Sequence, residues 1–138
     1  MNAKQKIEQL TRSWYGYAVF AAVLSVLSLQ ATGVLSLMIG LGLSIALNAI
    51  GLVIAIAITT FLGRRLLARS NGTRLFLVVF SGLFSVLGAL ATLTSAWSFL
   101  TSWTLASVCS VVLSASSTLL NVRSFRVLRE TAVRAYFV

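Results

Sequence analysis

The hydrophobic residues of the chain fall into two long stretches that contain no charged residue. No Asp, Glu, Lys, Arg or His occurs between Trp14 and Gly63, or between Leu75 and Val122. A membrane-spanning helix needs about 20 apolar residues to cross about 30 Å of hydrocarbon. Each stretch is long enough for two spans joined by a short turn, and too short for three. The pattern therefore predicts four membrane-spanning helices.

Turn residues divide the two stretches into spans and make the predicted fold an all-α membrane protein of two hairpins. Gly33 marks the end of the first span or the turn after it, and Asn71-Gly72 is a turn signal inside a basic loop between the second and third spans. A polar and aromatic turn over residues 94–102 separates the last two. The predicted spans cover about residues 14–36, 39–62, 75–93 and 103–122, within a single domain of residues 1–138.

The composition argues against a soluble helical bundle. Only 9% of the residues are charged and 59% are hydrophobic, whereas about a quarter of the residues of a soluble domain are charged. A soluble bundle would also need a polar face on each helix. The four predicted spans show no such face, so the membrane interpretation is favoured.

The basic residues predict the orientation of the chain. All eleven Lys and Arg residues lie before the first span, between the second and third, or after the fourth. Short loops rich in Lys and Arg stay in the cytoplasm. With four crossings, all three basic segments and both termini lie on that side. We expect the protein in the plasma membrane, the inner membrane if the cell is bacterial.

The two predicted hairpins share a weak similarity. A shift of sixty residues aligns residues 20–32 with residues 80–92, including the Phe, Ser, Val, Leu, Ala and Thr positions common to both. This indicates a parallel repeat of two hairpins, related by an axis along the membrane normal. The alternative is chance agreement within a composition rich in Leu, Val, Ala and Ser, because the second and fourth spans do not align.

Small and hydroxyl residues recur at helical spacing along each span. In lipid, helices associate through close backbone approach and interhelical hydrogen bonds, which such stripes provide. The alternative is a path lined by hydroxyl groups for a neutral solute or an ion, and Asn48 is the deepest amide that either a helix contact or a ligand site could use. The candidate packing or path-lining residues are Ser25, Ser44, Asn48, Ser85, Gly88, Ser107, Ser110, Ser114 and Ser117.

The residue types that most enzymes and metal sites require are missing. The chain has no His, and its two acidic residues, Glu8 and Glu130, lie outside the predicted spans. No paired carboxylates, Ser–His pair or phosphate-binding glycine loop is present. Cys109 is the single cysteine. We therefore expect no enzymatic activity, and predict no catalytic, cofactor-binding or metal-binding residue.

The basic side of the chain is a candidate surface for anionic lipid headgroups, which attract basic residues by about 1 kcal/mol each. The segment 123–138 also has an apolar stripe, so it could lie in the membrane interface, continue the fourth span, or bind an acidic partner. No motif for nucleic-acid binding is present. The candidate lipid contacts are Arg64, Arg65, Arg123, Arg126, Arg129 and Arg134.

These observations favour a non-enzymatic membrane protein that acts by helix–helix packing, as a homo-oligomeric scaffold or as a subunit of a larger membrane complex. The alternative is a minimal channel or facilitator for a small solute or ion. A third possibility is an immunity-type protein that neutralises a membrane-active toxin, although the uncharged outer turns give it little support.

Overall fold

The computed structural model describes residues 2–31 and 38–137, and only the backbone of residues 29–31, 38–41 and 44. In this part of the chain the regular structure is entirely helical. The helices are α1 (Ala3–Ala31), α2 (Met38–Leu67), α3 (Asn71–Thr101), α4 (Leu105–Arg129) and α5 (Thr131–Tyr136).

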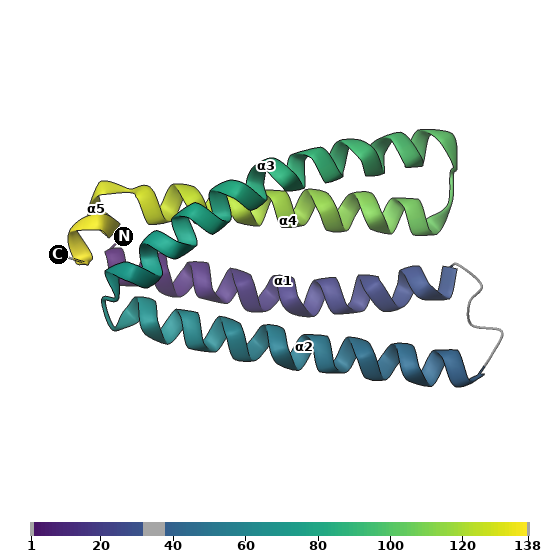
Figure 1. Ribbon diagram of the computed structural model, residues 1–138, viewed down its shortest axis with the longest axis horizontal. Helices are drawn as coiled ribbons and strands as arrows, with labels where there is room; N and C mark the ends of the chain where they lie inside the picture. Colours follow the sequence, from purple (N-terminus) through teal and green to yellow (C-terminus); the bar gives the residue numbers. More distant parts are fainter. Residues whose placement is uncertain (1, 32–37, 138) are drawn as a thin grey trace.

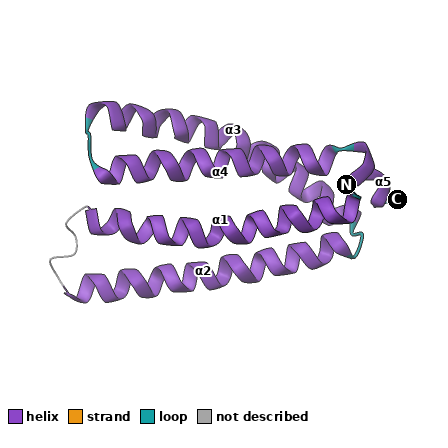
Figure 2. Ribbon diagram, turned by 180° about the vertical axis from the view of Figure 1, so that it is seen from behind, coloured by secondary structure: helices purple, strands orange, loops and turns teal. Residues whose placement is uncertain are grey.

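The four long helices form two antiparallel pairs that lie beside each other (Figures 1 and 2). Helix α1 packs against α2 on one side and against α4 on the other, and α3 packs mainly against α4. Helices α2 and α3 meet at the short turn that joins them and then diverge along the bundle (Figure 1). The spatial order is therefore α2, α1, α4, α3, with an open side between α2 and α3.

Three helices of the described region are long and apolar enough to cross a membrane. They are α3, α4 and the part of α2 from Ile45 to Leu67, with 31, 25 and 23 residues respectively. At 1.5 Å per residue these lengths exceed the hydrocarbon thickness of about 30 Å. Only 6–11% of the most apolar window of each helix is buried inside the protein, so the apolar side chains face outward. The prediction of a helical, membrane-embedded protein is confirmed at this level.

The turn between α2 and α3 is shorter than the predicted basic loop. Helix α2 continues to Leu67 and ends with Arg69 in the left-handed region, at φ 58°. The backbone N–H of Ser70 donates to the Arg65 carbonyl at 3.1 Å, which is the Schellman pattern of a helix C-terminus. The predicted turn at Asn71-Gly72 is wrong, because the Ser70 side chain caps α3 and places both residues in its first turn.

The other turn is also shorter than expected. Helix α3 continues through the predicted turn of residues 94–102 as far as Thr101, whose hydroxyl donates to the Trp97 carbonyl at 3.2 Å. Hydroxyl side chains that bond back in this way remain compatible with a helix. Thr104 then caps α4 through a reciprocal capping box with Ser107.

The C-terminal segment adopts one of the arrangements considered for it, continuation of the fourth span, and then folds back in a way that was not predicted. Residues 123–129 continue the fourth long helix, since α4 ends at Arg129. The chain then turns at Glu130, whose backbone is extended, and α5 folds back against α1 and α4.

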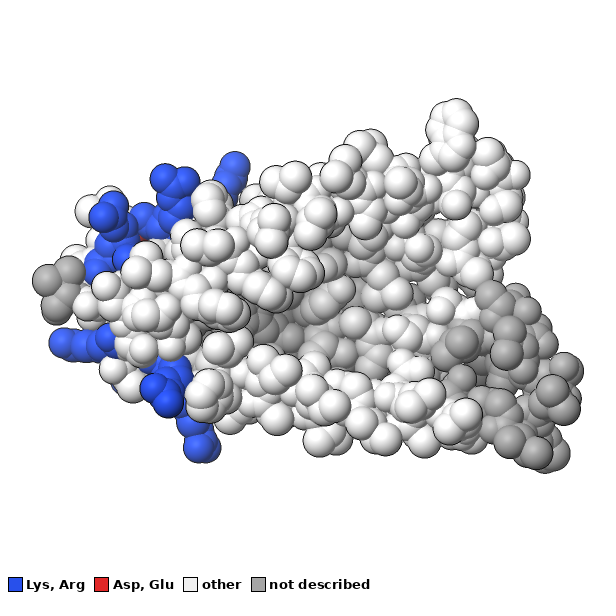
Figure 3. Space-filling model, in the orientation of Figure 1, with Lys and Arg blue, Asp and Glu red and all other residues white. Residues whose placement is uncertain are grey.

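The Lys and Arg side chains gather at the end of the bundle that carries both termini, the α2–α3 turn and α5, which we call the basic end (Figure 3). This end also contains the hydrophobic core, which joins residues from all five helices. The buried side chains of this basic-end core are Ala3, Ile7, Leu10, Leu66, Leu77, Leu128, Val133 and Phe137. Burial of apolar groups is favourable where the alternative is water, so a core at a water-exposed end is physically consistent.

Candidate functional site

A cavity of about 560 Å³ lies between the two helix pairs and is lined by all four long helices. Figure 3 shows the surface hollowed between the α1–α2 pair and the α3–α4 pair. On α3 the lining residues are Leu77, Phe80 and Ser81, close to the start of the helix. The cavity is therefore displaced toward the basic end, and Leu77 belongs both to its wall and to the basic-end core.

The wall combines apolar side chains with uncharged polar ones, and none of its residues is charged. Small residues such as Ala18, Ala21, Gly51 and Ala55 leave the space open. The polar side chains come from every long helix and are Tyr17, Ser25, Asn48, Thr59, Ser81, Ser117, Asn121 and Ser124. Such a wall offers both hydrogen-bond donors and acceptors without a fixed charge.

Some of these polar groups have their hydrogen bonds within the protein. Ser25 donates to the Ala21 carbonyl at 2.7 Å, and Ser124 donates to the Leu120 carbonyl at 2.8 Å. The Asn121 side-chain N–H donates to the Ser117 carbonyl at 2.9 Å. These groups are satisfied by the helix that carries them.

Other polar atoms of the lining residues have no hydrogen-bond partner among the described residues. They are Tyr17 Oη, Thr59 Oγ1, Ser117 Oγ and Asn121 Oδ1. A polar group removed from water without a hydrogen bond costs roughly 1–3 kcal/mol on mutational scales. At membrane depth, bulk water does not supply that bond. The wall is therefore suited to a molecule that enters the cavity and brings its own hydrogen-bonding groups.

The cavity is closed toward the basic end. Trp14 lines it and donates from Nε1 to Ser124 Oγ at 2.9 Å, which joins α1 to α4. Trp14 and Leu62, which is also in the wall, pack directly against the basic-end core. Between the cavity and the basic end there is consequently a packed apolar layer rather than a continuous polar path.

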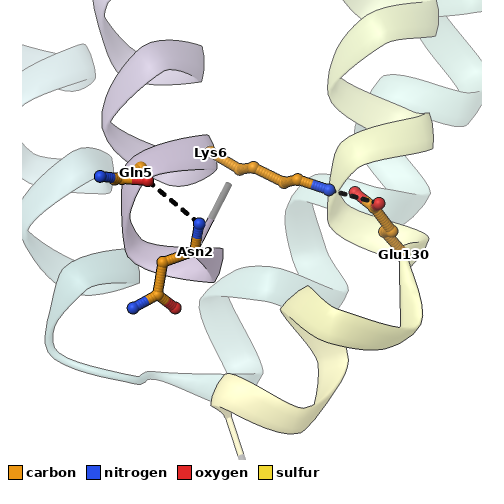
Figure 4. A network of polar contacts seen from close by, with 4 residues as sticks. All are labelled: Asn2, Gln5, Lys6 and Glu130. Carbon is orange, nitrogen blue, oxygen red and sulfur yellow. Dashed lines mark hydrogen bonds and ion pairs between the residues drawn. The ribbon is translucent and has the colours of Figure 1, made fainter.

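Further polar contacts hold the basic end together. Lys6 forms a hydrogen-bonded ion pair with Glu130, while Asn2 donates to Gln5 within the start of α1 (Figure 4). The Tyr136 hydroxyl donates to the Leu67 carbonyl at 3.0 Å and so connects α5 to α2. The Lys6–Glu130 and Tyr136–Leu67 contacts join segments that are far apart in the sequence, at the same end where the cavity is closed.

The stripe residues of α3 and α4 serve a different purpose, because they pack the two helices against each other. A Cβ atom added at Gly88 would lie 2.5 Å from Thr118 Oγ1, so the helices approach closely there. Thr92 and Thr118 are hydrogen-bonded at 3.3 Å, and Ser95 and Ser110 at 3.2 Å. Small residues and interhelical hydroxyl contacts are typical of membrane helix interfaces.

The candidate residues taken from the sequence thus separate into groups. Ser25, Asn48 and Ser117 line the cavity. Gly88 and Ser110 lie at the α3–α4 contact.

The other candidates have local roles. Ser85 and Ser114 donate to carbonyl oxygens of their own helices, and Ser107 caps α4. The side chain of Ser44 lies outside the described residues.

Several wall residues were absent from that set of candidates, namely Tyr17, Thr59, Ser81, Asn121 and Ser124. A fourth span that ends at 122, as predicted from the sequence, places Asn121 at the membrane surface. Helix α4 instead extends to Arg129 and places Asn121 two turns inside it. The i, i+4 spacing of Ser117 and Asn121, continued by Ser124, was the available signal.

The six arginines proposed to contact anionic lipids are all exposed at the basic end. Two of them lie over aromatic rings of their own helix: Arg65 is 5.2 Å from the Phe61 ring centre, and Arg129 is 5.0 Å from that of Phe125. These cation–π contacts keep the guanidinium groups along the helix surface.

Comparisons of the chain with protein families, with curated proteins and with solved structures find no match. Within the residues that the structure describes, no group of three His, Cys, Asp or Glu side chains could hold a metal ion.

Proposed function

We propose that the chain is a non-enzymatic membrane protein of four spans, arranged as two hairpins, that binds a small uncharged molecule in the cavity between them. The observation that carries this proposal is the set of polar wall atoms without partners in an uncharged cavity. Ligand sites in helical bundles commonly lie between the helices, have volumes of about 300–1,000 Å³, and combine apolar walls with a few polar groups. The cavity of about 560 Å³ fits this description.

The fourth span of this proposal is α1. Its segment 14–31 contains no charged residue, and α1 lies beside α2 along the bundle. Eighteen helical residues extend about 27 Å, which is close to the thickness of the hydrocarbon layer. Four crossings bring every basic residue to one side, and the positive-inside tendency makes that side the cytoplasm.

The packing stripes give less support to assembly with a partner. The strongest stripe contacts, those around Gly88 and Thr118, join α3 to α4 within one chain. These contacts are used within the chain. A scaffold or subunit role is therefore the weaker proposal.

A continuous channel is also less well supported. The hydroxyl groups of the wall end at the basic-end core, in which Leu66 and Leu128 are fully buried. Solute could pass only if α5 and the helix ends moved apart. A binding role requires no such movement.

The direct test is to identify what the purified protein holds. The full chain is extracted in mild detergent and analysed by native mass spectrometry, beside Ser117→Leu and Gly51→Leu, which fill the cavity. A Cβ atom at Gly51 meets no atom within 4 Å, so this variant adds bulk without a backbone clash. Gly42, with equally open space, provides the control Gly42→Leu.

We expect a bound uncharged compound in the wild type and in Gly42→Leu, and at least a tenfold lower amount in the two cavity-filling variants. Equal amounts in all four proteins would show that the compound binds elsewhere. A cavity that holds only water in the wild type would overturn the proposal.

A further inference from the structure

Among the described helices, the cavity is open between α2 and α3. The other neighbouring helices, α1 with α2, α1 with α4 and α3 with α4, pack against each other, whereas α2 and α3 diverge beyond their common turn (Figure 1). A molecule that reaches the wall without separating packed helices therefore passes between α2 and α3. In a membrane this side is in contact with lipid.

The two sides of that opening are apolar. Leu47 on α2 and Phe80 on α3 both line the cavity, and they are 60% and 43% exposed. The Phe80 ring stacks on those of Phe76 and Phe84, with centres 5.6 and 4.2 Å apart, so an aromatic row follows α3 beside the opening. Such a surface is suited to an alkyl or isoprenoid chain.

Polar groups occupy the opposite wall. Tyr17 on α1 and Ser117 and Asn121 on α4 belong to the two helices that lie across from the opening. Their hydroxyl and amide oxygens include atoms that have no partner in the described chain. A molecule entering from the bilayer would meet apolar side chains first and hydrogen-bonding groups at the far wall.

The absence of charge from the lining limits the head group of that molecule. A phosphate or carboxylate would be buried against hydroxyls and amides with no cation in the wall, and burial of an unpaired charge is strongly unfavourable. No arginine belongs to the lining: the arginines lie at the basic end, where most are exposed and Arg74 is half-buried. The cavity volume suits a molecule with one chain, since it lies within the range of ordinary small-molecule sites.

We infer that the ligand is an uncharged amphiphile of the bilayer with one apolar chain and a hydroxyl, carbonyl or amide head, and that it enters between α2 and α3. This inference rests on the proposed binding function and adds the class of ligand and its route. Its head group forms hydrogen bonds with the α1 and α4 wall, and its chain lies against the apolar residues that α2 and α3 contribute to the wall.

Photolabelling in vesicles tests this inference. The full chain is reconstituted in phosphatidylcholine with monooleoylglycerol that carries a diazirine in its acyl chain, and crosslinked peptides are mapped by mass spectrometry. Leu47→Trp narrows the opening. Leu43→Trp is the matched control, because Leu43 is equally exposed, at 61%, one helical turn away and outside the cavity wall.

We expect crosslinks to wall residues in the wild type and in Leu43→Trp, and at least a tenfold reduction in Leu47→Trp and in Ser117→Leu. The same label on lysophosphatidic acid, which has a charged head, should not reach the wall. Equal labelling in all variants would mean contact with surrounding lipid only, and equal labelling by the charged lipid would exclude the uncharged head. Circular dichroism melting of each variant in the same vesicles shows that the fold is intact, and Gly51→Leu replaces any variant that does not fold.

The two proposals can fail separately. If the photolabel never reaches the wall but native mass spectrometry still finds a bound compound that Gly51→Leu removes, then the amphiphile class and the lipid route are wrong and the binding function stands. If neither experiment detects a molecule that depends on the wall, both proposals are wrong.

Discussion

Hydroxyl side chains of the long helices have two distinct roles in this protein. Many donate to a carbonyl three or four residues earlier in their own helix, as Ser85 does to Ser81 at 2.6 Å. Thr118 does this as well, with Ser114 at 2.8 Å, but its oxygen also contacts Thr92 on the neighbouring helix. A hydroxyl group that is satisfied locally can therefore face lipid, whereas those of Thr118 and Ser110 also contact a hydroxyl on the neighbouring helix.

The Gly88–Thr118 contact gives a prediction at the scale of single residues. Gly88→Ala places a methyl group 2.5 Å from Thr118 Oγ1, and rotation of the threonine away from it loses two hydrogen bonds. We expect a loss of about 1–3 kcal/mol in the free energy of unfolding, as is typical for overpacking. Thermal or denaturant unfolding in detergent, followed by circular dichroism, measures it.

The double variant Gly88→Ala/Thr118→Ala provides the control, because the remaining Thr118 Cβ atom would lie at 3.4 Å from the new methyl group. We expect the second change to recover part of the loss, so that the two effects are not additive. Additive destabilisation would contradict the proposed contact.

Which serine packs and which one lines a cavity could be predicted from the sequence only in part. Periodicity identifies the stripe on each helix, and Gly88 and Asn48 were both found in this way. It does not tell which stripes face each other at close range. In α3 and α4 the stripes meet, whereas those of α1 and α2 border the space between the helix pairs. That difference depends on the angles between helices, which no single stripe encodes.

At the scale of whole helices, the protein uses two kinds of packing. The fully buried large side chains of the described region all lie at the basic end, including Ile7, Leu66 and Leu128. In the apolar middle of the helices, contacts are instead made by Gly, Ser and Thr. The difference follows from the solvent, because leaving lipid gives an apolar side chain no hydrophobic gain.

This contrast predicts that two leucines of α4 contribute very differently to the free energy of unfolding. Leu128 is 0% exposed in the basic-end core, and Leu119 is 70% exposed on the same helix. Leu128→Ala should lower the free energy of unfolding by about 2–5 kcal/mol, as deletion of buried groups usually does. Leu119→Ala should have little effect, because the leucine faces lipid in both the packed and the separated helix.

Unfolding of both variants in vesicles, measured under one set of conditions, compares them directly. Equal destabilisation would mean that Leu119 is buried in an interface, which would favour the scaffold or subunit role over the binding role.

Helix ends were predicted less well than helices. The charged and polar residues near Gly63 and Thr94 suggested loops, yet both segments are helical. Long helices can extend beyond the hydrocarbon into water, where charged residues are tolerated, so hydropathy marks the membrane boundary rather than the end of the helix. The caps Ser70 and Thr104 mark the true starts of α3 and α4.

At the scale of the molecule, the two ends of the bundle differ in how firmly the helix pairs are joined. At the basic end the pairs share the core, the Trp14–Ser124 hydrogen bond and the Lys6–Glu130 ion pair. Farther along the bundle, the Thr92–Thr118 and Ser95–Ser110 hydrogen bonds join α3 to α4, which belong to the same pair. The cavity lies next to the basic-end core, on the side away from the termini. The distance between the two helix pairs can therefore change there without a change in the basic-end core.

The four-span arrangement can be tested by the side on which introduced cysteines are labelled. With Cys109 replaced by Ser, single cysteines are placed at Asn2, Asn71 and Ser102, all of which are exposed. We expect a membrane-impermeant maleimide to label Ser102→Cys in intact cells, and Asn2→Cys and Asn71→Cys only after permeabilisation. If Asn2→Cys and Asn71→Cys were labelled from opposite sides, α1 would not cross the membrane.

The general architecture could be predicted because the charged residues of the chain are confined to a few segments. The cavity could not, since it results from the divergence of α2 and α3 on opposite sides of the α1–α4 contact. The prediction of an internal repeat remains open. The Phe20 and Phe80 segments lie in α1 and α3, but Phe80 lines the cavity and Phe20 does not.

The pairing of the first residues of α1 with the last helix has a consequence for synthesis of the protein. Ile7 and Leu10 belong to a core that also needs Leu128, Val133 and Phe137. At translation rates of about 5–20 residues per second, the partners of Leu10 emerge on the order of ten seconds after it. During that interval the four long helices can already be inserted. Closure of the basic end therefore follows synthesis of the long helices, because it needs α5.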